Sequence, residues 1–324
     1  MPDARRPDPP PADSRGRRPL AVRLCNWVGE VVLSVPTLQR LEAAGYELHL
    51  LGKGWAGALL EGAGWSVATR RAGLWQAARQ LAELRRSLDA EPHAGAPAAL
   101  LLTKSFSSAL EARLGGWRPV GYAHDGRSLL LASAYPLPDF AHAAHAYWHL
   151  ASCLLGAQAP YPTAITLTPS AAQAARARAL LDERALADGS FVVLCPFSGP
   201  DDREQRKVWP GFADLGRRLA ERGVVPVVCP GPGEESIAAE RLPGAVRLPG
   251  LDLGVYGALM ARARAVVAND TGPGHLAAAV GARLIAVYGR QSVAAWAPLG
   301  PRVELLHETN GWPTLERVTA AVCA

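Results

Sequence analysis

The sequence predicts an α/β protein built from two doubly wound parallel sheets that face a cleft. Short apolar runs typical of buried strands alternate with stretches whose apolar residues recur at helical spacing, and this alternation indicates parallel sheets covered by helices. The alternation occurs in two series, separated near residue 160 by a stretch that contains proline and threonine. A chain of 324 residues is long enough for two domains of about 150 residues each.

The first series spans residues 20–114. We expect strands at residues 20–25, 46–51 and 98–102, and helices at residues 30–44, 74–88 and 105–114. Gly45 suits the end of the first helix, because glycine readily adopts the left-handed conformation found there. Pro36 lies within that helix, so we expect a kink or a later helix start.

The second series begins at Ser170, a residue type that often caps a helix N-terminus. We expect helices at residues 170–181, 210–222, 253–262 and 273–280, and strands at residues 191–195, 224–229, 265–268 and 284–288. The two series predict an N-terminal domain over residues 19–165 and a C-terminal domain over residues 166–324, with a last helix able to pack back on the N-terminal domain.

Composition narrows the function classes. Residues 1–18 are rich in proline, arginine and aspartate and lack the apolar segment of a secretory signal, so we expect a disordered tail. No apolar run reaches the roughly 18 residues of a membrane-spanning helix. The net charge of +5 fits an anionic substrate or membrane surface, but the basic residues do not form the clustered stripe of a nucleic-acid-binding protein. Five widely spaced cysteines indicate thiols in a reducing cytoplasm.

The strongest motif follows the expected strand at residues 265–268. The sequence continues Asn-Asp-Thr-Gly-Pro-Gly-His over residues 269–275 and then into a helix. Ligands of such sheets bind beyond the carboxyl ends of strands, and backbone N–H groups at a helix N-terminus suit a diphosphate. We therefore expect Asp270, Thr271, Gly272 and His275 to bind a nucleotide. The alternative is a plain strand–turn–helix in which Asp270 caps the helix.

Two further loops of this half carry groups suited to a nucleotide. Ser198, Gly199 and Lys207 lie between an expected strand and the next helix, where a hydroxyl and an ammonium can hold phosphate oxygens. Glu234 follows another strand, where a carboxylate can accept hydrogen bonds from ribose hydroxyls. The alternatives are a solvated loop cation and an acid that complements a helix dipole.

These segments resemble motifs of the lipopolysaccharide heptosyltransferases. Residues 270–279 are similar to the family's D-T-G-x-x-H-L-A-A, residues 207–210 to K-x-W-P, and residues 231–234 to G-P-x-E. Residues 288–301 resemble F/Y-G-x-T-x-P…W-x-P-x-G-P, with Gln291 at the usual Thr and Val293 at the usual Pro. The resemblance implies two Rossmann-like domains in the GT-B arrangement, with an ADP-sugar bound by the C-terminal domain.

The N-terminal half continues the resemblance and implies the acceptor side. Residues 29–36 are similar to the family's G-D-x-V-x-x-x-P, in which the acid after glycine is the general base; here it is Glu30 rather than Asp. Residues 101–110 resemble a strand followed by N-S-F-x-S-A-L, with Lys104 where Asn is common, and residues 118–130 resemble a loop R-x-x-G-Y-x-x-x-G-R-x-x-L. The implied acceptor-binding residues are Asn26, Trp27, Gly29, Lys104, Ser105, Arg118 and Arg127.

The resemblance implies a bacterial, metal-independent, inverting glycosyltransferase without a cofactor. Glu30 and Lys207 would be catalytic, an ADP-heptose the donor, and an anionic lipopolysaccharide core the acceptor. Such an enzyme would be cytoplasmic, with peripheral contact to the inner face of the inner membrane compatible with its acceptor. Without the resemblance, Glu30 is an ordinary first-turn acid, and Lys104, Arg118 and Arg127 are surface cations.

Two other functions remain open. A related GT-B enzyme could use another nucleotide sugar or a protein acceptor, and a homologue that has lost its base could bind a nucleotide sugar without transferring it. A nicotinamide oxidoreductase is less favoured, because the first strand is followed by Asn-Trp-Val-Gly-Glu over residues 26–30 rather than by G-x-G-x-x-G.

Overall fold

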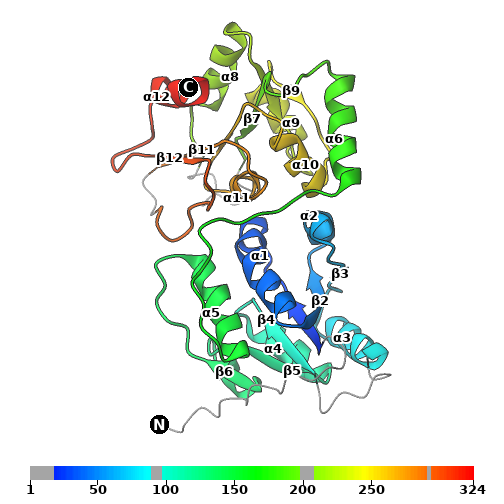
Figure 1. Ribbon diagram of the computed structural model, residues 1–324. Coiled ribbons are helices and arrows are strands. Elements are labelled where there is room, and N and C mark those ends of the chain that lie inside the picture. The colour runs from blue at the N-terminus through cyan, green and yellow to red at the C-terminus, as the bar shows by residue number, and fades with distance from the viewer. Residues whose placement is uncertain (1–17, 89–96, 198–207, 290–292) are drawn as a thin grey trace. The chain divides into compact units, whose positions relative to one another are not determined.

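The structure is a computed structural model that describes residues 18–88, 97–197, 208–289 and 293–324. Two compact units emerge, one of residues up to Gly57 together with Trp65–Pro162, and one of Ala58–Gly64 together with Thr163–Ala324. Each contains a six-stranded parallel sheet with helices packed against it (Figure 1). The α/β class and the two parallel sheets are therefore confirmed.

The sheet of the first unit has the strand order β3-β2-β1-β4-β5-β6. This is the Rossmann order 3-2-1-4-5-6, in which the chain changes direction across the sheet between the first and fourth strands. The elements are β1 (Arg18–Arg23), α1 (Val28–Ala43), β2 (Tyr46–Gly52), α2 (Ala56–Leu60), the 3-10 helix η1 (Glu61–Ala63), β3 (Val67–Thr69), α3 (Leu74–Leu88), β4 (Ala98–Leu101), α4 (Phe106–Leu114), β5 (Arg118–Tyr122), the 3-10 helix η2 (Arg127–Leu129), β6 (Ser133–Tyr135) and α5 (Ala143–Leu155).

The sheet of the second unit repeats this order as β9-β8-β7-β10-β11-β12. Here the change of direction falls between β7 and β10, which are hydrogen-bonded neighbours. The elements are α6 (Ala171–Glu183), β7 (Phe191–Cys195), α8 (Phe212–Glu221), β8 (Val225–Val228), α9 (Glu235–Arg241), β9 (Val246–Arg247), α10 (Leu253–Met260), β10 (Ala265–Ala268), α11 (Gly272–Ala279), β11 (Leu284–Tyr288), β12 (Val303–His307) and α12 (Leu315–Cys323).

Helix α1 begins at Val28, earlier than the sequence predicts, and contains Pro36. A later start at the proline is therefore wrong. An interior proline costs roughly 3 kcal/mol, whereas the helix buries six large aliphatic side chains that each contribute about 1.5–3 kcal/mol: Val31, Val32, Leu33, Val35, Leu38 and Leu41. Burial outweighs the proline. After the helix, Gly45 has a φ of 86°, as its expected role requires.

Several short or marginal elements are absent from the sequence-based prediction. Strands β3 and β6 have three residues each, and β9 has two, so their apolar patterns are too short to be recognised. The segment at residues 118–122, expected as a loop, is strand β5, because it pairs with β4 inside the sheet. Pairing with a neighbour, rather than local propensity, decides these segments.

Arg18 was expected in a disordered tail, but it is the first residue of β1. Its backbone N–H donates to the Gly45 carbonyl at 3.0 Å, and its guanidinium lies 4.4 Å from the centre of the Tyr46 ring. The rest of the expected tail, residues 1–17, lies outside the described residues.

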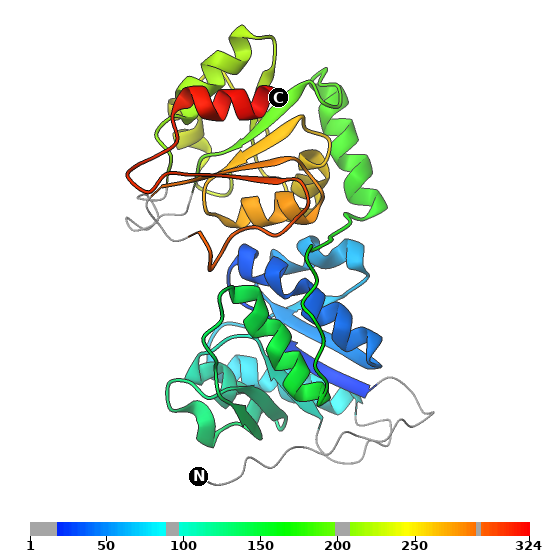
Figure 2. The same cartoon turned by 60° about the vertical axis from the view of Figure 1, so that its left-hand side comes forward.

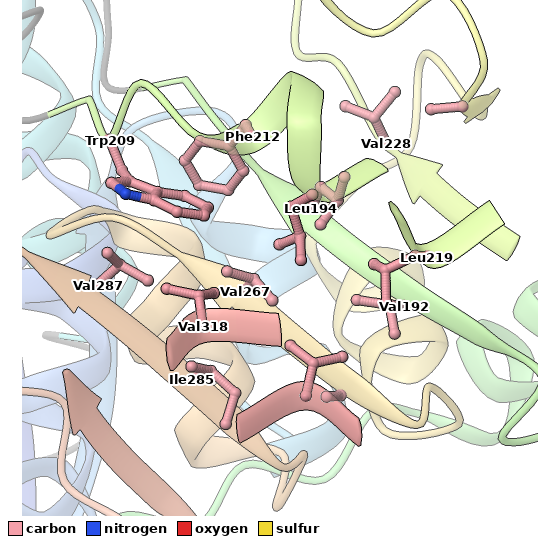
Figure 3. Close-up of a cluster of buried hydrophobic side chains, with 14 of the residues drawn as sticks. Val192, Leu194, Trp209, Phe212, Leu219, Val228, Val267, Ile285, Val287 and Val318 are labelled. Carbon is pink, nitrogen blue, oxygen red and sulfur yellow. The ribbon is translucent and has the colours of Figure 1, made fainter. Parts of the chain in front are cut away.

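A buried cluster links the sheet of the second unit to two helices that flank it. Leu194, Val267, Ile285 and Val287 face Trp209, Phe212 and Val318 in this cluster (Figure 3). Helix α12 packs against α8 and β11, within the second unit (Figure 2). The Trp209 indole N–H donates to the Pro313 carbonyl at 3.0 Å, which ties the segment before α8 to the segment before α12.

No helix in the described part of the chain combines the length and the apolar character that crossing a membrane requires.

Candidate functional site

The first unit gathers most of its expected site residues at the carboxyl edge of its sheet. Asn26, Trp27, Gly29 and Glu30 follow β1, and Lys104 and Ser105 follow β4. Because β1 and β4 are parallel neighbours, their carboxyl ends meet at the point where the strand order reverses. Ligands of such sheets bind at this point.

Asn26 and Trp27 are both exposed at this edge. Trp27 stands at the N-cap of α1 with 69% of its surface exposed, and the Asn26 side-chain oxygen accepts a hydrogen bond of 2.9 Å from the Arg23 guanidinium. Arg23 therefore orients Asn26, while the indole of Trp27 lies open to solvent.

Glu30 projects from the first turn of α1 and is half-buried. Its Oε1 accepts a hydrogen bond of 3.2 Å from the Tyr147 hydroxyl, which comes from α5. Burial raises the pKa of Glu30, while the Tyr147 hydroxyl, the charge of Lys104 and a backbone hydrogen bond at Trp27 lower it; burial is the largest effect. A raised pKa combined with a held carboxylate suits a proton acceptor.

Lys104 and Ser105 occupy the loop between β4 and α4. The Ser105 side chain caps α4 by accepting from the Ser108 N–H at 3.4 Å, so its hydroxyl has a local structural partner. Lys104 is exposed, and its charge acts on the Glu30 carboxylate. The loop thus places a cation near the acid, and an acceptor contact by either residue stays a prediction.

Arg127 is fully buried, which corrects its interpretation as a surface cation. Its expected acceptor contact stays a prediction. Its guanidinium donates to the carbonyls of Tyr122 at 2.9 Å, Thr103 at 2.7 Å and Ser105 at 3.2 Å. Burial lowers the pKa of Arg127 to about 10, so the group stays charged at neutral pH. It holds the loop that carries Lys104 from within the unit.

Arg118 lies at the opposite edge of the same sheet. It is the first residue of β5 and pairs with Ala98 at the start of β4, and its N–H donates to the Pro97 carbonyl at 3.0 Å. Glu30 and Lys104 follow the other ends of these parallel strands. The structure therefore does not bring Arg118 together with the other acceptor-side candidates, because the residue begins a strand instead of following one.

The second unit places the strongest sequence motif at the matching point of its own sheet. Asp270 and Thr271 follow β10, Thr271 is the N-cap of α11, and Gly272 is the first helical residue. The Thr271 side chain makes no cap hydrogen bond. His275 is buried and lies in the first turn of the helix. The residues just before it, Asp270, Thr271 and Gly272, are half-buried. This arrangement presents a helix N-terminus at the carboxyl edge, which suits an anionic group.

Asn269 is a site residue that sequence reasoning missed. Only 1% of its surface is exposed. Its side-chain oxygen accepts a hydrogen bond of 2.9 Å from the backbone N–H of Trp209, and its side-chain nitrogen donates to the Pro196 carbonyl at 3.2 Å. It thereby fastens the segments that follow β7 to the end of β10. The signal that could have indicated this role is an asparagine directly after an apolar strand, because a buried amide is usually fully hydrogen-bonded. The sequence does not show which groups are its partners.

Replacing Asn269 by Ala should destabilise the protein by about 2 kcal/mol, because the buried Trp209 N–H and the Pro196 carbonyl lose their partners. Urea unfolding measures this, and calorimetric titration with ADP should show weaker binding. The exposed Gln76→Ala on α3 removes an amide elsewhere as the control and should change stability by less than about 0.5 kcal/mol. An Asn269→Ala protein as stable as this control would contradict the fastening role.

Glu234 follows β8 and occupies the N-cap of α9. Its Oε2 accepts from the Gly231 N–H at 2.8 Å, and burial raises the pKa of its carboxyl group above the ordinary range. One oxygen therefore supports its own loop, and the expected ribose contact stays a prediction. Ser198, Gly199, Lys207 and Gln291 lie outside the described residues.

Within the described ranges, no three His, Cys, Asp or Glu side chains come together as a metal-binding group.

The sequence matches glycosyltransferase family 9 (heptosyltransferase) over residues 82–323. No curated protein matches it. Among solved structures, the chain is similar to the ADP-heptose lipopolysaccharide heptosyltransferase II of E. coli, with a TM-score of 0.75 and 22% identity over 94% of this chain and 97% of that one.

Two further structures agree with this fold. A family 9 glycosyltransferase from Veillonella parvula has a TM-score of 0.76 and 18% identity, covering 90% of this chain and 86% of that one. The E. coli heptosyltransferase WaaC with ADP has a TM-score of 0.69 and 20% identity, covering 93% of this chain and 98% of that one. At these identities the structures support the fold, while the family match covers most of the chain. The chain therefore belongs to glycosyltransferase family 9, the heptosyltransferase family.

Proposed function

We propose that this glycosyltransferase moves heptose from ADP-heptose to a lipopolysaccharide core acceptor, with inversion at the anomeric carbon and without a metal. The observation that carries the proposal is the position of Glu30, a half-buried acid held by a tyrosine where the first sheet reverses its strand order. The family match and the helix N-terminus at the equivalent point of the second sheet support the nucleotide-sugar donor.

In the proposed reaction, Glu30 takes the proton of the acceptor hydroxyl. The hydroxyl oxygen forms a bond to the anomeric carbon as the bond from that carbon to the diphosphate breaks, and ADP leaves with the electron pair. The N–H groups at the start of α11 stabilise the negative charge that develops on the diphosphate. Lys207 acts as a further positive charge on the leaving group.

Exposed side chains at the carboxyl edge of the first sheet support an anionic, amphiphilic acceptor. Trp27, Trp75, Phe106 and Leu129 are exposed there, between 46% and 94%, in segments that follow β1, β3, β4 and β5. The exposed Lys53 and Lys104 follow β2 and β4. Apolar groups interspersed with cations suit a glycolipid in an anionic surface. We therefore propose a cytoplasmic protein that makes peripheral contact with the inner membrane.

Incubation with ADP-heptose and a series of truncated core oligosaccharides tests the proposal. Mass spectrometry should show the acceptor gaining one heptose, and the rate should be unchanged in EDTA. UDP- and GDP-sugars are the comparison donors: transfer from one of these alone would point to another GT-B activity. Donor binding without transfer to any acceptor would identify an inactive nucleotide-sugar-binding homologue.

A further inference from the structure

Tyr147 contacts the proposed base from a helix more than one hundred residues away in sequence. It lies on α5, which packs against α1 (Figure 1), and only 7% of its surface is exposed. Its hydroxyl donates to Glu30 Oε1 at 3.2 Å. Because the ring is enclosed by packing, the hydroxyl is a fixed donor rather than a mobile one.

The side chain of Glu30 needs such a fixed partner. Glutamate has one more methylene than aspartate and therefore one more rotatable bond to immobilise, and a base must hold its oxygen within about 3 Å of the proton that it removes. The hydrogen bond to Oε1, together with the backbone hydrogen bond at Trp27, selects one orientation of the carboxylate. Within the first unit, the other titratable groups that act on this carboxylate are Lys104 and Cys25.

We propose that Tyr147 is a positioning residue, which holds the longer Glu30 side chain in the orientation that presents its carboxylate to the acceptor hydroxyl. This inference rests on the proposed function, because it assigns Tyr147 a role through Glu30. It also accounts for a glutamate at this position, because the Tyr147 hydrogen bond immobilises the additional rotatable bond of the longer side chain.

The surrounding groups keep Tyr147 a donor. Burial raises the pKa of Tyr147 above its ordinary value, and burial also raises the pKa of the Cys25 thiol to about 12. At neutral pH both groups are therefore protonated, and neither adds a negative charge beside Glu30. The Tyr147 hydrogen bond favours the ionised carboxylate, so its removal should raise the pKa of Glu30.

The variant Tyr147→Phe removes the hydroxyl and keeps the ring. We expect kcat to fall about 10-fold with donor and acceptor KM changed by less than about twofold, because substrate binding does not use the hydroxyl. The acid limb of the pH–kcat profile should move up by about one pH unit, because the base then ionises at higher pH. A purely structural role would not move this limb.

Tyr161→Phe is the matched control. The Tyr161 hydroxyl donates to the Leu33 carbonyl of α1 at 3.4 Å and does not reach Glu30, so its loss should leave the pH profile unchanged. In a Glu30→Asp background the shorter carboxylate no longer reaches Tyr147, so adding Tyr147→Phe should have no further effect on kcat. Fully additive losses in this cycle would overturn the inference.

A direct titration separates this inference from the proposed function. Carboxyl ¹³C chemical shifts of glutamate-labelled protein report the pKa of Glu30, whose signal is assigned by its absence in Glu30→Gln. This pKa should be higher in Tyr147→Phe, whether or not transfer is observed. An unchanged Glu30 pKa would refute the role of Tyr147 and leave the transferase proposal intact. Full activity of Glu30→Gln would refute the proposed base itself.

Discussion

Replacing Glu30 by Gln should reduce the proposed heptosyl transfer by a factor of about 10² to 10⁴, the usual contribution of a general base. The amide has nearly the same shape and can still accept the Tyr147 hydrogen bond, but it cannot take a proton from the acceptor hydroxyl. ADP affinity should be unchanged, because the nucleotide is expected at the second sheet. Single-turnover transfer and calorimetric titration with ADP measure the two quantities separately.

Glu42→Gln is the control, since Glu42 lies near the other end of α1, remote from the carboxyl edge of the sheet. It should transfer heptose at the parent rate. If Glu30→Gln also kept the parent rate, the mechanism would need another base or a different active site. If Glu30→Gln lost ADP binding as well, its defect would be general rather than a missing proton acceptor.

The second large effect is expected for Arg127→Met, which should lower the free energy of unfolding by about 3–5 kcal/mol. Methionine fills part of the space but donates no hydrogen bond, so the carbonyls of Tyr122, Thr103 and Ser105 lose the guanidinium that pairs with them. Urea unfolding followed by tryptophan fluorescence measures the change, and the Lys104 loop should become more accessible to proteases.

Arg118→Met makes the same chemical change at an exposed position in β5 of the same unit, and it should alter stability by less than about 0.5 kcal/mol. Both positions were expected to bind the acceptor on sequence grounds. An Arg127→Met protein as stable as Arg118→Met, but with weakened acceptor binding, would support that expectation for Arg127 and contradict its role inside the unit.

The fold class and the position of the turn before α11 could be predicted because their signals are local. Apolar runs mark β1, β4, β7 and β10, and the residues after each run must lie at the carboxyl edge once the sheets are parallel. The placement of Glu30 after β1 and of Asp270 after β10 therefore follows from chain order. Strands of two or three residues, such as β9, carry too little pattern to be found this way.

The two arginines show where local reasoning stops. Arg118 and Arg127 are both polar residues of one motif, yet one begins a strand at the far edge and the other is buried. Nothing in their sequence neighbourhoods separates them. The position of Arg118 results from the pairing of β5 with β4, and the burial of Arg127 is made possible by carbonyls of the loop after β4, which accept its hydrogen bonds.

By itself the sequence determined that this chain forms two parallel-sheet units. It also placed an acid after β1 and a glycine-containing turn after β10, since strand ends and helix starts depend on neighbouring residues. Only the tertiary structure decided which side chains act on that acid and that turn. Tyr147 reaches Glu30, and Asn269 reaches Trp209, across long stretches of chain. Tyr147 meets Glu30 because α5 packs on α1, and Asn269 meets Trp209 because β10 lies beside β7. The apolar periodicity of one segment does not show which other segment packs against it.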